Sequence, residues 1–265
     1  MTKITFLLGY EDDAEWITMD SLILKSVLEL HKDKYDYIIL NSKEFYSDNK
    51  LKDKNEFPKE YENSIPVGSI QFVNNFINIF IKEFDGENSI EIPPVLRKYE
   101  FLKRQYKILP YGQINDANDV FIKDAEGVKT FSNNGEYGRE SINKDHLFIV
   151  SEKIDVKAEY RIYVIRNKVK NICRYLGDPL YLPDLSLVNK MVNLYSMSSY
   201  CPQSYSIDVM VNDKGTALLE VHSFSSLGLF STKWDEDLAL AEVDGFNYIV
   251  NMNPRQTSFQ GFENV

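Results

Sequence analysis

Two short apolar strands joined by a tight turn constrain the fold of this chain more than any other feature. Residues 206–211 and 218–222 alternate in side-chain character and flank the sequence Asn-Asp-Lys-Gly at 212–215. That four-residue sequence has the chemistry of a hairpin turn. The chain is therefore predicted to contain an antiparallel hairpin close to its C-terminal end.

Three side chains of this hairpin are able to bind a metal ion. Because side chains alternate between the faces of a strand, Asp208 shares a face with Ser206, and Glu220 shares a face with His222. If the two faces coincide, two carboxylates and an imidazole converge, an arrangement that holds a divalent cation against a phosphate. The alternative is two solvated acids on neighbouring strands, but the apolar residues beside both acids predict strands with a buried opposite face.

Composition narrows the class of protein. A chain of 265 residues with 43% hydrophobic residues is long enough for one large domain or two to three smaller lobes. Forty acidic and thirty basic residues give a net charge of −10, which argues against broad binding to nucleic acid or anionic membranes. No apolar run approaches the roughly 20 residues of a membrane span, and the N-terminus does not resemble a signal peptide, so a cytoplasmic location is expected. Cys173 and Cys201 lack metal-ligand spacing and are predicted to be free thiols.

The first part of the chain predicts a small α/β lobe. Apolar residues recur at helical spacing between two short apolar runs, and the order strand, helix, strand indicates a parallel pairing. A charged surface excursion and a second strand and helix follow. The predicted elements are a strand at 4–8, a helix at 20–31, a strand at 37–40, the excursion at 46–63, a strand edge at 65–70 and a helix at 71–84.

The rest of the chain predicts two further lobes that begin after the double proline at 93–94. A linker helix is expected first, then paired strands, a loop, a long hairpin, a helix and the hairpin described above. These elements are placed at 95–106, 120–123, 128–131, 132–145, 147–150, 159–165, 169–175 and 184–197, with a last helix near 234–241 and a polar tail after 253.

This order of elements resembles the ATP-grasp superfamily. A lysine-bearing strand pair, the E-x-R sequence at 159–161, a basic return strand, a helix, and the sequences D-x-M and L-L-E-V-H at 208–210 and 218–222 carry the resemblance, which covers roughly residues 95–230. Within the superfamily the chain is most similar to a small clade associated with phages and bacteria, and residues 66–73 share that similarity. The resemblance implies an α+β ATP-grasp fold, with a pre-ATP-grasp lobe at 1–92 and two lobes at 93–150 and 151–265 that clasp ATP.

The resemblance also implies which residues contact the nucleotide. Lys123 matches the lysine that reaches the α- and β-phosphates, with Lys129 as a second candidate, and the linker lysine is either Lys98 or Lys103. The hinge backbone near Glu152 would contact the adenine edge, and Glu159 would accept hydrogen bonds from the ribose hydroxyls. The expected nucleotide-contacting residues are Lys98, Lys123, Lys129, Glu152, Lys153, Ile154 and Glu159.

Two arginines are the expected catalytic residues. Arg161 and Arg174 each alternate with apolar neighbours and are predicted to share the phosphate-facing side of their hairpin. Positive charge beside a transferring phosphoryl group is most of what such a site must supply. The alternative is a structural ion pair with Asp178 or Glu159.

Asp208, Glu220 and His222 take the magnesium-binding positions of the superfamily. The third position is normally asparagine, and an imidazole suits softer divalent ions, so the expected cofactors are ATP with Mg²⁺ or Mn²⁺. Ser206 stands where many relatives have arginine, and residues 225–228 resemble the small-residue loop for the acceptor substrate. Residues 133–138 are the candidate phosphate-covering loop.

The expected activity is that of an ATP-dependent ligase that joins a carboxylate to an amine through an acylphosphate. Its partners would be small-molecule or peptide substrates, without nucleic acid or membrane. His222 and Ser206, which depart from the superfamily pattern, favour an alternative in which the chain is a nucleotide-binding sensor without ligase turnover. A structural α/β interaction protein is a third interpretation.

Overall fold

The computed structural model of the protein describes residues 3–11, 15–84, 92–114, 120–124, 143–231 and 233–251, with the backbone alone for 15–18 and 124. The chain divides into two compact units. The first comprises Met1–Glu87, Pro202–Tyr205 and Ser223–Met252, and the second includes Asn88–Cys201 and Ser206–His222. The expected domain boundaries near residues 92 and 150 stay predictions.

The first unit is built on a parallel three-stranded sheet with the order β2-β1-β5. Its strands are β1 (Ile4–Tyr10), β2 (Tyr35–Asn41) and β5 (Ile65–Val67). Both β2 and β5 pair with β1 in parallel, which confirms the predicted α/β unit. Phe6, Leu7 and Leu8 are each at most 1% exposed, because helices cover both faces of a parallel sheet and every strand position is buried.

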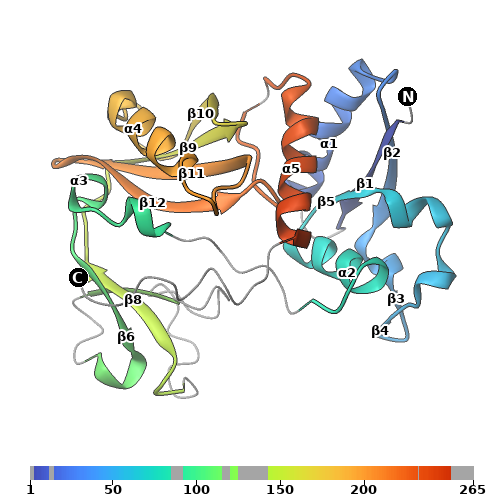
Figure 1. Ribbon diagram of the computed structural model, residues 1–265, viewed down its shortest axis with the longest axis horizontal. Coiled ribbons are helices and arrows are strands. Elements are labelled where there is room, and N and C mark those ends of the chain that lie inside the picture. The colour runs from blue at the N-terminus through green and yellow to red at the C-terminus, as the bar shows by residue number, and fades with distance from the viewer. Residues whose placement is uncertain are drawn as a thin grey trace. The chain divides into compact units, whose positions relative to one another are not determined.

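Three helices surround this sheet: α1 (Glu15–Leu30), α2 (Ile70–Phe80) and α5 (Asp237–Asn251). In Figure 1, α5 lies beside α1, although more than 200 residues separate them in the chain. Phe246 of α5 packs edge-on against Phe76 of α2, with ring centroids 5.9 Å apart. The helix predicted at 234–241 therefore exists, but it begins later, extends further and completes the core of the N-terminal unit.

The predicted surface excursion is a chain of short elements that pack through aromatic rings. Phe45 is fully buried and contacts Phe57 and Phe72 at centroid distances of 6.0 and 4.8 Å. Capping boxes at Asn41 and Asp53 satisfy the first backbone N–H groups of two of its turns. The elements are η1 (Ser42–Phe45), β3 (Tyr46–Ser47), β4 (Lys50–Leu51), η2 (Lys54–Glu56) and η3 (Lys59–Asn63).

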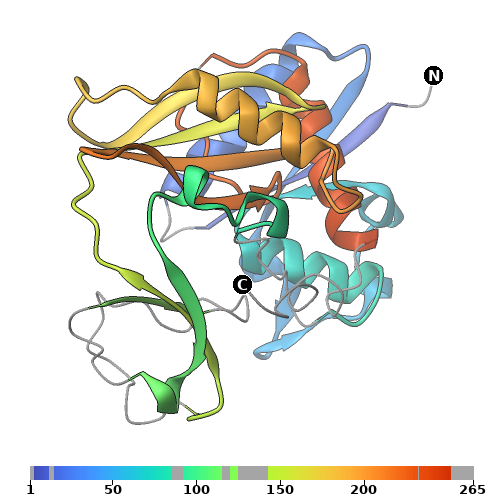
Figure 2. The same cartoon turned by 60° about the vertical axis from the view of Figure 1, so that its left-hand side comes forward.

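The second unit contains two sheets. A three-stranded antiparallel sheet has the order β6-β8-β7, and a four-stranded sheet has the order β10-β9-β11-β12. Helix α4 (Leu185–Ser196) covers one face of the larger sheet, and the chain passes from β8 to β9 through residues 153–157 (Figure 2). The strands are β6 (Tyr106–Pro110), β7 (Val120–Asp124), β8 (Leu147–Glu152), β9 (Ala158–Ile165), β10 (Lys168–Gly177), β11 (Ser204–Asn212) and β12 (Gly215–Ser223).

The linker helix predicted at 95–106 is wrong over most of its length. The structure has a single 3₁₀ turn, η4 (Pro94–Leu96), and a four-residue helix, α3 (Tyr99–Leu102). Lys103 then adopts a left-handed conformation with φ of 51°, which ends the helix before the unpredicted strand β6. Arg104 anchors this turn, because its guanidinium donates to the carbonyl of Leu218 over 2.7 Å.

Two smaller predictions concern the cysteines and the membrane. Cys173 and Cys201 are free, as predicted. In the described ranges, no helix combines the length and the apolar composition that crossing a membrane requires. The strand expected at 128–131, the loop at 133–138 and the tail after 253 lie outside the described residues.

Candidate functional site

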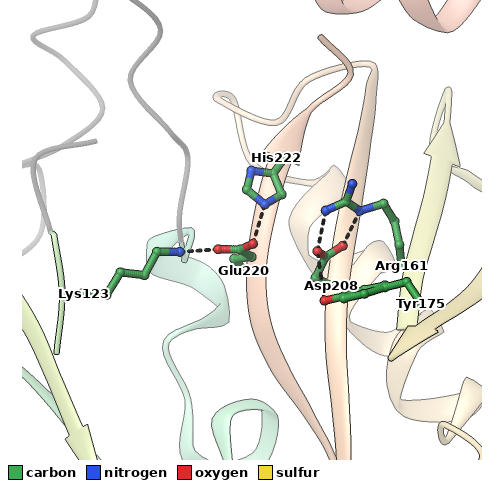
Figure 3. A network of polar contacts seen from close by, with 6 residues as sticks. All are labelled: Lys123, Arg161, Tyr175, Asp208, Glu220 and His222. Carbon is green, nitrogen blue, oxygen red and sulfur yellow. Dashed lines mark hydrogen bonds and ion pairs between the residues drawn. The ribbon is translucent and has the colours of Figure 1, made fainter. Parts of the chain in front are cut away.

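The hairpin of β11 and β12 brings the three predicted metal ligands together. One ligand atom each from Asp208, Glu220 and His222 lies within 4.8 Å of the others. Asp208 is 1% exposed, while Glu220 and His222 are partly buried, and His222 Nε2 lies 2.7 Å from Glu220 Oε1 (Figure 3). Alternation along the two strands thus places both carboxylates and the imidazole on one side of the sheet, as the sequence predicted.

Arg161 of β9 holds Asp208 in a two-pronged ion pair. Its Nε donates to Asp208 Oδ1 over 2.9 Å and a terminal nitrogen donates to Oδ2 over 2.7 Å. Burial alone lowers the pKa of Arg161, but the hydrogen bonds and charge of Asp208 raise it overall. Arg161 is therefore a fixed cation beside the cluster, paired with Asp208 rather than with the alternatives Asp178 or Glu159.

The prediction that Arg174 shares a face with Arg161 is wrong. In an unbroken register after the turn at 166–167 the two arginines would lie on one face, but β10 contains a bulge between Val169 and Asn171. This extra residue pairs Arg161 with Cys173 and turns Arg174 to the opposite face, because a one-residue slip exchanges the faces of a strand. Arg174 is exposed and its guanidinium donates to the carbonyl of Gly177.

Tyr175 occupies the position on the site face that was expected for Arg174. The Arg161 guanidinium carbon lies 5.7 Å from the centre of the Tyr175 ring, and the Tyr175 hydroxyl lies 3.5 Å from Asp208 Oδ2 (Figure 3). Burial raises the pKa of Tyr175 well above its usual range, with further contributions from Asp208 and from a hydrogen bond with Glu159. Sequence reasoning missed this residue because it weighed only charged side chains on β10.

Lys123 of β7 reaches the cluster from the three-stranded sheet and pairs with Glu220 (Figure 3). Both side chains are about four-fifths buried, at 20% and 21% exposure. Burial would raise the pKa of Glu220, but the hydrogen bond from His222 and the charges of His222 and Lys123 hold it far below its usual range. Glu220 is therefore an anion held between two nitrogen groups.

The sheet face that carries Lys123 is apolar and partly open. Ile149 of β8 pairs with both Ile108 of β6 and Lys123 of β7, so these three side chains share a face. Phe121, two residues before Lys123, lies on the same face and is 41% exposed. An apolar wall beside a cation is suited to a flat ring that carries phosphates.

The opposite face of the same sheet holds a different hollow. A cavity of about 490 Å³ is lined by Val120, Val150, Glu152 and Lys214, among others. The strand register places Val120 and Val150 on the face opposite to Lys123. This cavity is therefore separate from the cluster of Lys123, Glu220 and Asp208, and we do not assign the phosphate chemistry to it.

The predicted hinge residues follow β8 directly. Glu152 and Lys153 are exposed and Ile154 is partly buried, while Glu152 forms an exposed ion pair with Lys214 at 3.3 Å. Glu159 lies on β9 two residues before Arg161 and therefore on the site face. The structure thus brings Glu159 to the cluster, whereas the Glu152 side chain points to a surface partner.

The remaining predicted cations lie elsewhere. Lys98 occupies the N-cap position of α3 and is exposed, and Lys103 ends the same helix. Lys129 lies outside the described residues. Their expected contacts with a nucleotide stay predictions.

The donor atoms of the cluster fit a divalent cation. Two carboxylates supply the hard oxygen ligands that Mg²⁺ prefers, and the imidazole of His222 extends the range to Mn²⁺-like ions. The Oγ of Ser206, buried on the same face of β11, has no hydrogen-bond partner among the described residues. The site therefore offers ligand atoms and an unsatisfied polar atom on one strand face.

These features define an ATP-grasp protein: a lysine-bearing antiparallel sheet, a second sheet with the E-x-R strand, and paired carboxylates on its last hairpin. The chain matches the family model described as an ATP-grasp domain, clade family 2, over residues 101–239. Because this match spans more than half of the 265 residues, the chain belongs to that family. The prediction of an α+β ATP-grasp fold is confirmed.

Several solved structures share the fold. D-alanyl-alanine synthetase A from Vibrio cholerae aligns with a TM-score of 0.50 and 12% identity over 93% of this chain and 99% of that chain. D-alanine–D-alanine ligase from Bacillus anthracis complexed with ATP gives 0.49 and 16% over 94% and 96%, respectively. A RimK-domain ATP-grasp protein from Sphaerobacter thermophilus gives 0.45 and 11% over 94% and 98%. No curated protein sequence matches the chain.

Proposed function

We propose that this protein is an ATP-dependent ligase that joins a carboxylate to an amine or a similar nucleophile through an acylphosphate. The observation that carries the proposal is the convergence of Asp208, Glu220 and His222 within 4.8 Å, beside Lys123, in an ATP-grasp domain. The fold is shared with a D-alanyl-alanine synthetase, a protein named for joining two amino acids. At this level of identity the likeness supports the fold, and the site residues support the chemistry.

The nucleotide would bind against the face that carries Lys123. Ile108, Ile149 and Phe121 supply an apolar wall for adenine, and Glu159 is placed to accept hydrogen bonds from ribose hydroxyls. Lys123 would exchange its contact with Glu220 for the phosphates. Binding would therefore replace one ion pair of Lys123 with another and leave no buried charge unpaired.

Asp208, Glu220 and His222 would hold Mg²⁺ or Mn²⁺, which supplies charge neutralisation at the phosphates when bound. In the reaction a substrate carboxylate oxygen attacks the γ-phosphorus, and the bond between that phosphorus and the bridging oxygen of ADP breaks. The amine then attacks the acyl carbon, loses a proton and expels inorganic phosphate. Arg161 is placed to stabilise the negative charge that the phosphoryl oxygens carry during the first transfer.

A second candidate function is a nucleotide-binding module without ligase turnover. The observation that favours it is that Arg161 occupies both carboxylate oxygens of Asp208. In such a module the cluster would bind a nucleotide and a metal ion without transferring a phosphoryl group.

Release of ADP in the presence of hydroxylamine separates the two functions. Hydroxylamine captures an acylphosphate as a hydroxamate, so carboxylate pools that act as substrates are identified without knowledge of the natural amine. We expect ADP and hydroxamate to form together with Mg²⁺ or Mn²⁺, and to decrease roughly a hundredfold or more in Glu220→Gln. Asp213→Asn, an exposed acid in the turn of the same hairpin, is the matched control and should retain activity.

The outcomes assign the function. Nucleotide binding with no ADP formation across broad carboxylate and amine pools would favour the module. The absence of nucleotide binding with either metal would refute both candidates.

A further inference from the structure

Strand β10 is irregular at two places, and the second places an uncharged side chain in the site. The register shifts between Val169 and Asn171 and again between Arg174 and Leu176, so Tyr175 has no directly opposite residue on β9. Bulges beside active sites commonly redirect a side chain. Here the redirected side chain is the aromatic ring under Arg161.

Tyr175 contacts groups that belong to two different parts of the expected site. Its hydroxyl lies 3.5 Å from Asp208 Oδ2, and its ring centre lies 5.7 Å from the Arg161 guanidinium carbon. It also forms a hydrogen bond with Glu159. Asp208 is a candidate metal ligand and Glu159 is the candidate ribose ligand, so a single phenol connects both.

The ring and the hydroxyl of Tyr175 do different work. A guanidinium over an aromatic face is attracted by the ring quadrupole, which limits the orientations that Arg161 can adopt. The hydroxyl adds a hydrogen bond to acids that Arg161 already constrains. A phenylalanine at this position would keep the first contribution and lose the second.

We propose that Tyr175 is a positioning residue that fixes Asp208 and Glu159 relative to each other, so that metal binding and ribose recognition are coupled. This inference rests on the proposed function, because it assigns a nucleotide and a divalent ion to the cluster. Tyr175 itself touches neither reacting atom in this account. It acts through Asp208, Arg161 and Glu159.

The experiment is calorimetric titration of ADP into the protein at a series of Mn²⁺ concentrations. Tyr175→Phe is compared with Tyr160→Phe, which also removes one phenol hydroxyl from the same hairpin. Tyr160 is a matched control because it lies on the opposite face and its hydroxyl donates to the carbonyl of Tyr181 over 3.0 Å. Thermal unfolding of each variant establishes that it is folded.

We expect Tyr175→Phe to raise the Mn²⁺ concentration needed for half-maximal ADP affinity by roughly fivefold, the loss of about one hydrogen bond. Saturating Mn²⁺ should restore most of the affinity, which a general structural defect would not allow. The preference for ADP over 2′-deoxyADP should also decrease in Tyr175→Phe. Tyr160→Phe should change both quantities less than twofold.

Arg161→Lys provides an independent variant, because lysine keeps the charge but loses the two-pronged geometry and the stacking. If Tyr175 acts through Arg161 and Asp208, the double variant Tyr175→Phe/Arg161→Lys should lose less affinity than the sum of the single changes. Additive losses would overturn the proposed route of action.

The outcomes distinguish this inference from the proposed function. If the wild-type protein binds ADP with Mn²⁺ but Tyr175→Phe matches wild type at every Mn²⁺ concentration, the role of Tyr175 is refuted and the proposed function stands. If the wild-type protein binds no nucleotide at any Mn²⁺ concentration, both are refuted.

Discussion

Each candidate metal-binding carboxylate is neutralised by a cation from a different strand. Arg161 of β9 pairs with Asp208, and Lys123 of β7 pairs with Glu220. Buried carboxylates need such partners, because removing one partner leaves an uncompensated charge in the interior. A divalent ion that enters this cluster must therefore compete with two cations unless they are drawn elsewhere, and the phosphates of a nucleotide are a suitable destination for Lys123.

Replacing Lys123 with glutamine tests this competition. In Lys123→Gln, Glu220 loses its cationic partner, so we expect Mn²⁺ alone to bind roughly tenfold more tightly and ADP with Mn²⁺ to bind roughly tenfold less tightly. Titration calorimetry measures both affinities. Lys107→Gln is the matched control, since Lys107 is exposed and lies on the opposite face of the same sheet. Unchanged Mn²⁺ affinity in Lys123→Gln would contradict the competition.

Glu242 on α5 is a buried acid outside the cluster, and it makes stability depend on pH. It is 5% exposed, and burial together with the charge of Asp20 raises its pKa to about 8. Below pH 4.5 the carboxyl is protonated in both folded and unfolded chains. Between pH 4.5 and about 8 the folded state retains a proton that the unfolded state has lost, so this group's contribution to stability decreases as pH rises.

Glu242→Gln should remove this dependence. Relative to the variant, the free energy of unfolding of the wild-type protein should decrease between pH 5 and 8, by at most roughly 1.4 kcal/mol for each pH unit. Chemical denaturation at several pH values measures the difference. Glu60→Gln changes an exposed acid in the same unit and should show no such trend. Parallel curves for wild type and Glu242→Gln would refute the assignment.

At the scale of elements, the sequence identified strands by alternation but did not reveal their irregularities. The hairpin of β11 and β12 was predictable because apolar residues alternate around Asp208 and Glu220 with turn residues between them. The bulges of β10 leave no comparable signal, since neither Lys170 nor Tyr175 is a residue type that marks a bulge. The faces of Arg174 and Tyr175 therefore followed only from the strand register.

Strand β6 and the linker illustrate a second limit. Residues 95–106 contain helix-forming residues, but the four-residue helix α3 ends at Lys103, which has a positive φ. Arg104 is buried against the carbonyl of Leu218, a contact between segments far apart in the sequence. Tertiary contacts of this kind override local helix propensity.

Helix α5 depends on one glycine for its contact with the segment that follows β12. A Cβ on Gly245 would lie 1.7 Å from the carbonyl oxygen of Phe224. Alanine normally favours a helix over glycine by about 1 kcal/mol, but Gly245→Ala should instead destabilise the protein, because helix and backbone must separate. Asn247→Ala, at an exposed position of the same helix, should be neutral or slightly stabilising. Thermal unfolding of both variants tests this, and a stabilised Gly245→Ala would contradict the close contact.

At the scale of the whole molecule, the order of elements carried the fold class, whereas the grouping of elements in space did not follow chain order. Residues 223–252 return to the unit that contains β1 and α1, and α5 completes its core. Helical periodicity predicted the presence of α5 but not its partner, because an apolar stripe specifies burial without naming the surface that buries it.

Net charge also acts at this scale. A chain with a formal charge of −10 repels a polyanionic nucleotide at long range, so recognition of ATP must rely on local cations and a metal ion. Lys123 and Arg161 are partly buried cations placed for this purpose. Substrate selection would then depend on the groups that surround this small positive region.

The central claim is that Asp208 and Glu220 hold a divalent ion against nucleotide phosphates that Lys123 contacts. A crystal structure with Mn²⁺ and a non-hydrolysable ATP analogue, with the metal located by its anomalous scattering, tests it most directly. The account predicts an anomalous peak bonded to carboxylate oxygens of Asp208 and Glu220, with Lys123 transferred from Glu220 to the phosphates. A nucleotide bound elsewhere, or a metal ion that contacts neither carboxylate, would contradict it.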